Sequence, residues 1–219
     1  MEVLGIRTAR VIAYVPIEEI NPFGKVLIPT VTAAFVERYG FMAFPQTLAD
    51  FDETKGVAFG VGTWKDIAID RVTIYNNGIL VDTRESTHAS EDFLSDAMTW
   101  LGETLGVKYK PETFHRKGYL SEVLVRCDKP LSRLHPAIEA WCNKLSVYLE
   151  PFTDRQKLSF ELSGLAFGYD PLSTKLPISQ FRIERLLDTP FSENKYYAAA
   201  PLPTGIHLEL LTDLESLLV

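Results

Sequence analysis

The stretch from Ile67 to Gly106 constrains the fold more than any other part of this sequence, because it predicts a β-hairpin that leads directly into a helix. Two runs rich in β-branched residues, Ile69–Tyr75 and Ile79–Arg84, flank the tripeptide Asn76-Asn77-Gly78. Asparagine and glycine tolerate the positive φ angles that tight hairpin turns require. We therefore predict that the two runs pair as neighbouring antiparallel strands.

The helix after the hairpin is predicted to begin at Ser90, whose hydroxyl suits an N-cap, with the acidic Glu91 and Asp92 in its first turn. Apolar residues then recur at helical spacing, and Gly106 is a natural end. This apolar stripe consists of Phe93, Leu94, Ala97, Met98, Trp100, Leu101 and Leu105. We expect the stripe to lie against the sheet that contains the hairpin.

The rest of the chain also alternates between strands and helices. The predicted order to residue 106 is strand, helix, three strands, helix, and from about Gly118 it is strand, helix, two or three strands, helix. Because strands outnumber helices and mostly follow one another, we predict an α+β fold with a mainly antiparallel or mixed sheet and helices packed on one face. A single domain is expected to span residues 1–219.

Two five-residue segments at corresponding places echo each other. They are Gly56-Val57-Ala58-Phe59-Gly60 and Gly164-Leu165-Ala166-Phe167-Gly168. The echo leaves open an ancient duplication that relates two similar β-α-β-β-α halves, residues 1–106 and 118–219. One short match is thin support, so a single domain without internal repetition is the alternative.

Composition excludes several classes of protein. The net charge of −7 argues against broad nucleic-acid binding, which needs a cationic surface. The two cysteines, Cys127 and Cys142, are too few for a disulfide framework, and no CxxC or HExxH spacing occurs, so we predict no metal site and no cofactor. The sequence has no secretory pattern at its start and no apolar run of the roughly 18 residues that a membrane span needs. A cytoplasmic protein without a membrane partner is expected.

The register of the hairpin raises a question about charge. If Asn77-Gly78 forms a two-residue turn, Ile74 faces Val81, and further along the ladder Asp70 faces Glu85 while Arg71 faces Arg84. Like charges directly opposite destabilise a sheet. Three explanations remain open: the ladder ends before these residues, a three-residue turn shifts the register and pairs Asp70 with Arg84, or the acids share a cation and the arginines an anion.

The connection from the hairpin to the helix is dense in groups suited to acid–base or metal chemistry. If the protein is an enzyme, we predict a metal-assisted hydrolase or nuclease in which Asp82, Glu85 and His88, with Asp70 nearby, hold a divalent ion and Arg84 steadies a phosphate. The simpler interpretation is a polar loop whose hydroxyl groups cap the helix and whose acids suit its dipole. No spacing here matches a known nucleophile–base pair.

The one basic segment lies between Val107 and Gly118. Its cationic residues Lys108, Lys110, Arg116 and Lys117 are interleaved with the aromatic residues Tyr109, Phe114 and Tyr119. Charge with aromatic stacking is how proteins hold single-stranded nucleic acid, so such binding through residues 108–117 is one hypothesis. In an acidic chain the same segment can instead meet an acidic partner or be solvated.

Other features are expected to be structural. The two cysteines and the three tryptophans are predicted to be core residues, and His135 and His207, at helix starts, to cap or pack. A last helix carries a leucine stripe that includes Leu210, Leu214 and Leu217, which packs on its own sheet or docks on a second subunit.

The sequence contains no phosphate loop, nucleophile elbow, dinucleotide fingerprint or zinc signature. Most common nucleotide-binding and hydrolytic enzymes carry one of these motifs. Our leading hypothesis is therefore a non-catalytic assembly subunit that binds another protein or a second copy of itself. Its best candidate surfaces are the basic segment and the C-terminal helix.

Overall fold

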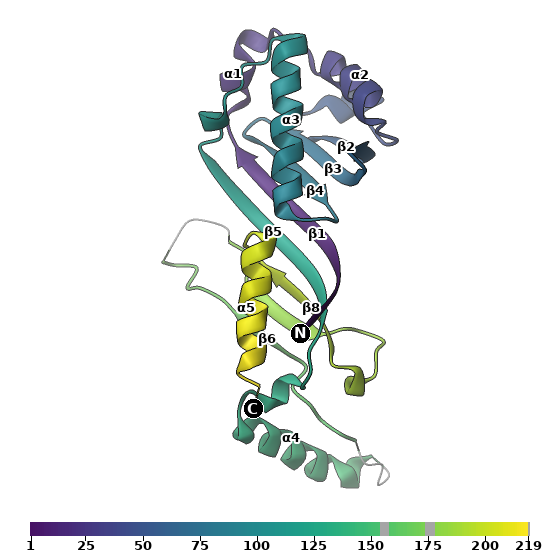
Figure 1. The fold of residues 1–219 in the computed structure, drawn as a ribbon, viewed down its shortest axis with the longest axis vertical. Helices are drawn as coiled ribbons and strands as arrows, with labels where there is room; N and C mark the ends of the chain where they lie inside the picture. The colour runs from purple at the N-terminus through teal and green to yellow at the C-terminus, as the bar shows by residue number, and fades with distance from the viewer. Residues whose placement is uncertain (154–157, 174–177, 219) are drawn as a thin grey trace. The chain divides into compact units, whose positions relative to one another are not determined.

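A computed structural model describes residues 1–153, 158–173 and 178–218 (Figure 1). The described residues form an α+β fold with one antiparallel sheet, as predicted, and five α-helices. The sheet has eight strands in the order β2-β3-β4-β1-β5-β8-β7-β6. The strands and α-helices, in chain order, are β1 (Glu2–Tyr14), α1 (Ile17–Ile20), α2 (Ile28–Tyr39), β2 (Val57–Trp64), β3 (Ile67–Tyr75), β4 (Gly78–Thr83), α3 (Thr87–Leu105), β5 (Arg116–Arg126), α4 (Pro136–Leu149), β6 (Gly164–Phe167), β7 (Phe181–Arg185), β8 (Lys195–Ala200) and α5 (Thr204–Ser216).

The contacts divide the chain into two compact units, which we describe one at a time. The first unit contains residues 6–121 and 201–204, and the second contains residues 1–5, 122–200 and 205–219. By order along the chain we also distinguish a first half, from β1 to α3, and a second half, from β5 to α5.

The predicted hairpin exists, but its register differs from the prediction. Tyr75 pairs with Gly78, so the two-residue loop is Asn76-Asn77, and Ile74 faces Ile79 rather than Val81. No residue of the predicted turn has a positive φ. Gly78 is required for another reason, because a Cβ at this position would lie 2.6 Å from the carbonyl oxygen of Ala13 in the neighbouring strand β1.

A turn with positive φ angles does occur, but in the preceding hairpin, between β2 and β3. Trp64 pairs with Ile67, and the two loop residues between them, Lys65 and Asp66, have φ angles of 46° and 66°. Two consecutive positive φ angles characterise the type I′ turn that matches the twist of a two-stranded ribbon. Neither residue is a glycine or an asparagine, so no clear signal for this turn is present in the sequence.

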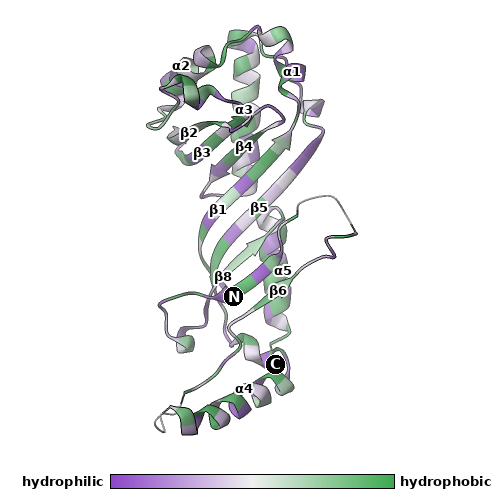
Figure 2. Ribbon diagram, turned by 180° about the vertical axis from the view of Figure 1, so that it is seen from behind, coloured by the Kyte–Doolittle hydropathy of each residue, from purple (hydrophilic) through white to green (hydrophobic). Residues whose placement is uncertain are grey.

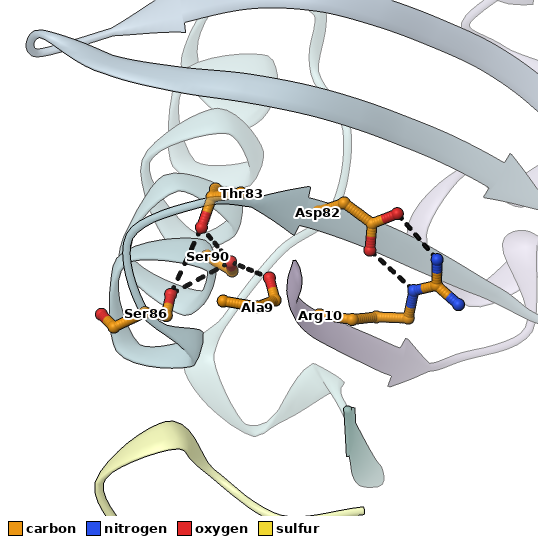
Figure 3. Close-up of polar contacts among 6 residues, drawn as sticks. All are labelled: Ala9, Arg10, Asp82, Thr83, Ser86 and Ser90. Atoms are coloured by element: carbon orange, nitrogen blue, oxygen red, sulfur yellow. Dashed lines mark hydrogen bonds and ion pairs between the residues drawn. The ribbon is translucent and has the colours of Figure 1, made fainter. Parts of the chain in front are cut away.

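The helix α3 begins one turn earlier than predicted. Ser86, not Ser90, is the N-cap, and its hydroxyl oxygen accepts a hydrogen bond of 3.0 Å from the backbone N–H of Ala89. Ser90 is fully buried instead and donates a 2.7 Å hydrogen bond to the carbonyl oxygen of Ala9 (Figure 3). The helix ends as predicted at Gly106, whose φ is 80°. Its apolar face, including Leu94 and Leu101, is buried in the core of the first unit.

The core of the first unit is rich in aromatic side chains. The helix α2 buries Val31, Phe35 and Tyr39, which are spaced four residues apart and therefore lie on one face. The Phe35 ring packs 5.3 Å from Phe59 of β2, with the planes at 61°. Together α2 and α3 cover the side of the sheet to which alternate strand residues, such as Val11 and Val81, contribute buried side chains.

The second unit has a smaller core around α5. His207 and Leu211, one turn apart on α5, are almost completely buried, and the His207 ring meets Phe181 of β7 edge to face at 5.6 Å. His135 caps α4 through a 3.2 Å hydrogen bond from the backbone N–H of Ala137 to its Nδ1. Both histidines thus confirm the expectation that they cap or pack. Cys127 and Cys142 are buried free thiols, also as expected.

Candidate interaction surfaces

Asp82 forms an ion pair on the side of the sheet away from α3. The Arg10 guanidinium donates two hydrogen bonds to the Asp82 carboxylate, at 2.6 and 2.8 Å, and Asp82 is buried (Figure 3). The next residue, Thr83, lies 2.9 Å from Ser90 of α3, so alternation along β4 directs Asp82 to the opposite face. The carboxylate is therefore neutralised by a fixed partner, which is how structural ion pairs are arranged.

The other residues of the predicted acidic site have separate partners. Arg84 donates a 2.7 Å hydrogen bond to Asp70, and exposed His88 lies 3.5 Å from Asp92 on its own helix. The pair of Asp70 and Arg84 is the one that a shifted register would give, but its cause is a bulge between Ile69 and Arg71 rather than a three-residue turn. The register set by the Asn76-Asn77 loop already places Arg71 opposite Asp82, before the bulge, so no like charges face each other there.

These residues do not form a common cluster. Glu85 is exposed, and in the described part of the chain no group of three or more histidine, cysteine, aspartate or glutamate side chains is placed to hold a metal ion. The metal-assisted hydrolase with Asp82, Glu85 and His88 therefore stays a prediction without a supporting contact. Cys127 is no nucleophile candidate either, because burial raises the pKa of its thiol to about 11.

The basic segment is divided between internal contacts and a groove. Lys117 pairs with Glu91 of α3 at 2.7 Å, and the Arg116 guanidinium lies 4.2 Å from the centre of the Tyr14 ring. Lys108 and Lys110 are exposed and border a groove of about 750 Å³ beside α3. Glu19 and Glu103 line the same groove, so its charge is mixed. A continuous cationic track for a phosphate backbone is therefore lacking among these described residues.

The leucines of α5 and of the residues that follow it differ in exposure. Leu211 and Leu218 are buried, whereas Leu217 is 58% exposed and Leu210 is also exposed. Leu214 is half-buried. Of the three predicted interface residues, Leu210 lies with exposed Ile206 on an outward-facing side of α5, whereas Leu217 follows the end of the helix at Ser216 and is exposed there.

The least expected surface is α4. Of its fourteen residues, Cys142 is the only one that is buried, and Trp141 is 60% exposed although the sequence analysis placed it in the core. Val147 and Tyr148 are exposed as well, and Figure 2 shows hydrophobic residues along the helix. The Lys144 Nζ lies 5.8 Å from the Trp141 ring centre and 5.5 Å from that of Tyr148.

The apolar residues of α4 span one broad arc of the helix. Ile138, Cys142, Leu145 and Leu149 fill most of this arc and are buried or half-buried, whereas Trp141 and Tyr148 lie at its edge and are exposed. The exposed edge is the part of α4 that is available for binding.

No protein-family model, curated protein or solved structure is significantly similar to this chain. Among the helices of the described residues, none combines the length and the apolar character that crossing a bilayer demands. What the chain binds has therefore to be inferred from its own surfaces, and its cytoplasmic location stays a prediction.

Proposed function

We propose that this protein is a non-catalytic assembly subunit that binds protein through the exposed helices of its second unit. One observation carries the proposal: α4 is a fourteen-residue helix with a single buried residue and an exposed Trp141. An isolated helix of this length is marginally stable in water, so it needs tertiary or intermolecular packing to persist.

The exposed side chains of α4 favour protein binding. Tryptophan and tyrosine are enriched among the residues that dominate protein interfaces, and a helix presents them at fixed spacing. Trp141 and Tyr148 lie two turns apart on the same side, with the Lys144 cation close to both rings. Exposed Leu210 on α5 and exposed Leu217 just after it provide a second apolar area in the same unit.

The proposal is tested by measuring association with the surface intact and with the surface altered. We expect the purified chain to self-associate with rising concentration in light scattering, or to retain a partner that co-purifies in fixed ratio. The double substitution Trp141→Glu and Tyr148→Glu should abolish the association, whereas Leu48→Glu, at a 94% exposed leucine of the first unit, should leave it unchanged. A strictly monomeric chain without a partner at high concentration contradicts the proposal.

A further inference from the structure

The two halves of the chain have the same order of elements and of strands. The first runs from β1 through a helical connection to β2, β3, β4 and α3, and the second runs from β5 through α4 to β6, β7, β8 and α5. Within the sheet the neighbours are β1-β4-β3-β2 and β5-β8-β7-β6, which is the same order read from the first strand of each half. By this order, α2 corresponds to α4, β2 to β6, and α3 to α5.

The echo between the two five-residue segments falls on the corresponding strands β2 and β6. Val57 and Phe59 in β2 match Leu165 and Phe167 in β6. Phe59 is 1% exposed because Phe35 of α2 covers it, whereas Phe167 is 54% exposed. In the second unit, the Phe167 ring meets Phe181 of the neighbouring strand at 5.8 Å, and among the described residues it contacts no other ring.

The helix α4, which corresponds to α2, does not cover Phe167, because the segment that joins α4 to β5 is held in place. Residues 127–135 connect β5 to α4, and a short 3₁₀ helix within them (Leu131–Leu134) is fixed to the second unit. Leu131 is completely buried, and its backbone N–H donates a 3.1 Å hydrogen bond to the Tyr196 hydroxyl. Lys129 Nζ donates a 3.0 Å hydrogen bond to the carbonyl oxygen of Leu218. Figure 1 shows that α4 lies away from β6 and β8 of its own unit.

The exposed side of α4 and the surface beside β6 are complementary. A groove of about 730 Å³ borders β6 and β7, and its apolar lining includes Leu165, Leu187 and Phe191. Arg182 and Glu184, which also line the groove, pair with each other, and Arg185 pairs with Glu161, so Asp188 is the lining carboxylate that has no ion-pair partner among the described residues. Lys144, between the two exposed rings of α4, likewise has no carboxylate partner in the described part. Opposite charges therefore accompany matching apolar surfaces.

The available area suits a dimer. A large aromatic side chain buries 150–250 Å², so each half-exposed ring at this surface offers roughly 100 Å². The rings of Trp141, Tyr148, Phe167 and Phe191 offer about 400 Å² by this measure. The exposed aliphatic side chains of Val147 and Leu187 add roughly 100 Å² each, which gives about 600 Å² per docked helix. A two-fold dimer makes this contact twice, and about 1,200 Å² is the lower bound of a stable specific interface.

From these observations, and on the basis of the proposed function, we propose that the partner is a second copy of this chain. The α4 helix of each copy packs on the β6–β7 surface of the other, in the place that α2 occupies over β2 in the first half. Trp141 and Tyr148 are the apolar anchors, Phe167 is the residue they cover, and Lys144 faces Asp188. The exchange is reciprocal and therefore closes at two copies.

Complementation between two variants tests this arrangement. Trp141→Glu damages only the helix and Phe167→Glu only the receiving surface, and each alone should raise the dimer dissociation constant at least tenfold, because both docked helices are lost. An equimolar mixture of the two variants regains one intact contact and should form a heterodimer that neither variant forms alone. Sedimentation velocity with one variant fluorescently labelled measures it.

Controls separate this proposal from the broader one. Trp141→Phe should preserve association, Leu48→Glu should not affect it, and circular dichroism shows that each variant is folded. Association that survives both Trp141→Glu and Phe167→Glu would disprove the reciprocal packing while leaving an assembly subunit intact. A mixture that shows no heterodimer, with Trp141 shielded from iodide quenching even at low concentration, would mean that α4 docks on its own sheet.

Discussion

The helices α2 and α4 follow the first strand of their respective halves, yet only α2 is packed. Val31, Phe35 and Tyr39 of α2 are buried in an aromatic cluster, whereas α4 buries Cys142 alone. The same position in the chain thus provides stability in the first half and an accessible surface in the second. If the halves arose by duplication, the change needed was small: a shorter connection and an aromatic stripe on the outer side of the helix.

The largest expected difference between the halves concerns these two helices. Phe35→Ala should lower the free energy of unfolding by about 4 kcal/mol, because it leaves a cavity next to Phe59, Tyr39 and Trp100. Trp141→Ala, at an exposed site, should cost less than about 0.5 kcal/mol when measured at low protein concentration. Urea unfolding followed by circular dichroism gives both values. Equal losses of unfolding free energy in the two variants would show that α2 and α4 do not differ in packing.

Acid should weaken the second unit more than the first. Burial lowers the pKa of His207 to about 4, while the unfolded value is about 6.5, so the unfolded state binds the proton first. Stability is therefore complete above pH 6.5 and falls as the pH drops towards 4, by roughly 3 kcal/mol. Hydrogen exchange at pH 7 and pH 4.5 should show opening around α5. His207→Leu should flatten this pH dependence, and an unchanged profile in that variant would assign the acid sensitivity to other groups.

A smaller difference in the free energy of unfolding is expected when the two halves are compared at a polar pair that joins the first and last strands of each half. In the first half the pair is Arg10 with Asp82, and in the second half Tyr197 donates a hydrogen bond to Glu122. Asp82→Asn should cost about 2 kcal/mol, because Arg10 loses a charged acceptor, and Tyr197→Phe about 1 kcal/mol. Thermal unfolding of the two variants ranks them, and the reverse order would show that Asp82 contributes little.

The smallest effect is expected from backbone strain in β2. Val61 has a φ of 55°, a conformation that β-branched residues rarely adopt, and its side chain is exposed. Val61→Asn should stabilise the protein by about 1 kcal/mol, because asparagine tolerates the left-handed region. Tyr169, at the matching position after β6, has no positive φ, so Tyr169→Asn should bring no such gain. A melting temperature unchanged by Val61→Asn would show that this strain is negligible.

Local signals predicted the elements of the fold well. The sequence correctly predicted that α3 ends at Gly106 and that α4 begins at Pro136. Alternating apolar residues also correctly indicated the strands of the hairpin. The predicted register was wrong because the register depends on contacts beyond the hairpin. Glycine is required at position 78 by the close approach of Ala13 and not by turn geometry. The N-cap was misplaced by one turn because Ser86 and Ser90 are both suitable cap residues, and the burial of Ser90 against Ala9 is a tertiary contact.

The candidate surfaces were harder to predict than the elements. Whether Trp141 is a core or a surface residue depends on whether a sheet reaches it, and periodicity within α4 cannot report that. Asp82 and Lys117 looked available in the sequence, but their partners Arg10 and Glu91 are distant along the chain. The predicted leucine stripe at the C-terminus is divided in the structure, because Leu211 and Leu218 are buried whereas Leu210 and Leu217 are exposed.

The backbone around Gly60 has a consequence for chain-to-chain growth. Ala43 and Gly60 exchange hydrogen bonds of 3.1 and 2.8 Å, and the Met42 N–H donates to Val61, so the middle of the outermost strand β2 already has its neighbour. The middle of that edge is therefore covered, and the opposite terminal strand is the four-residue β6. Edge-to-edge addition of folded molecules needs an accessible strand at both ends of the sheet, so this arrangement disfavours open-ended growth of the folded protein by strand pairing.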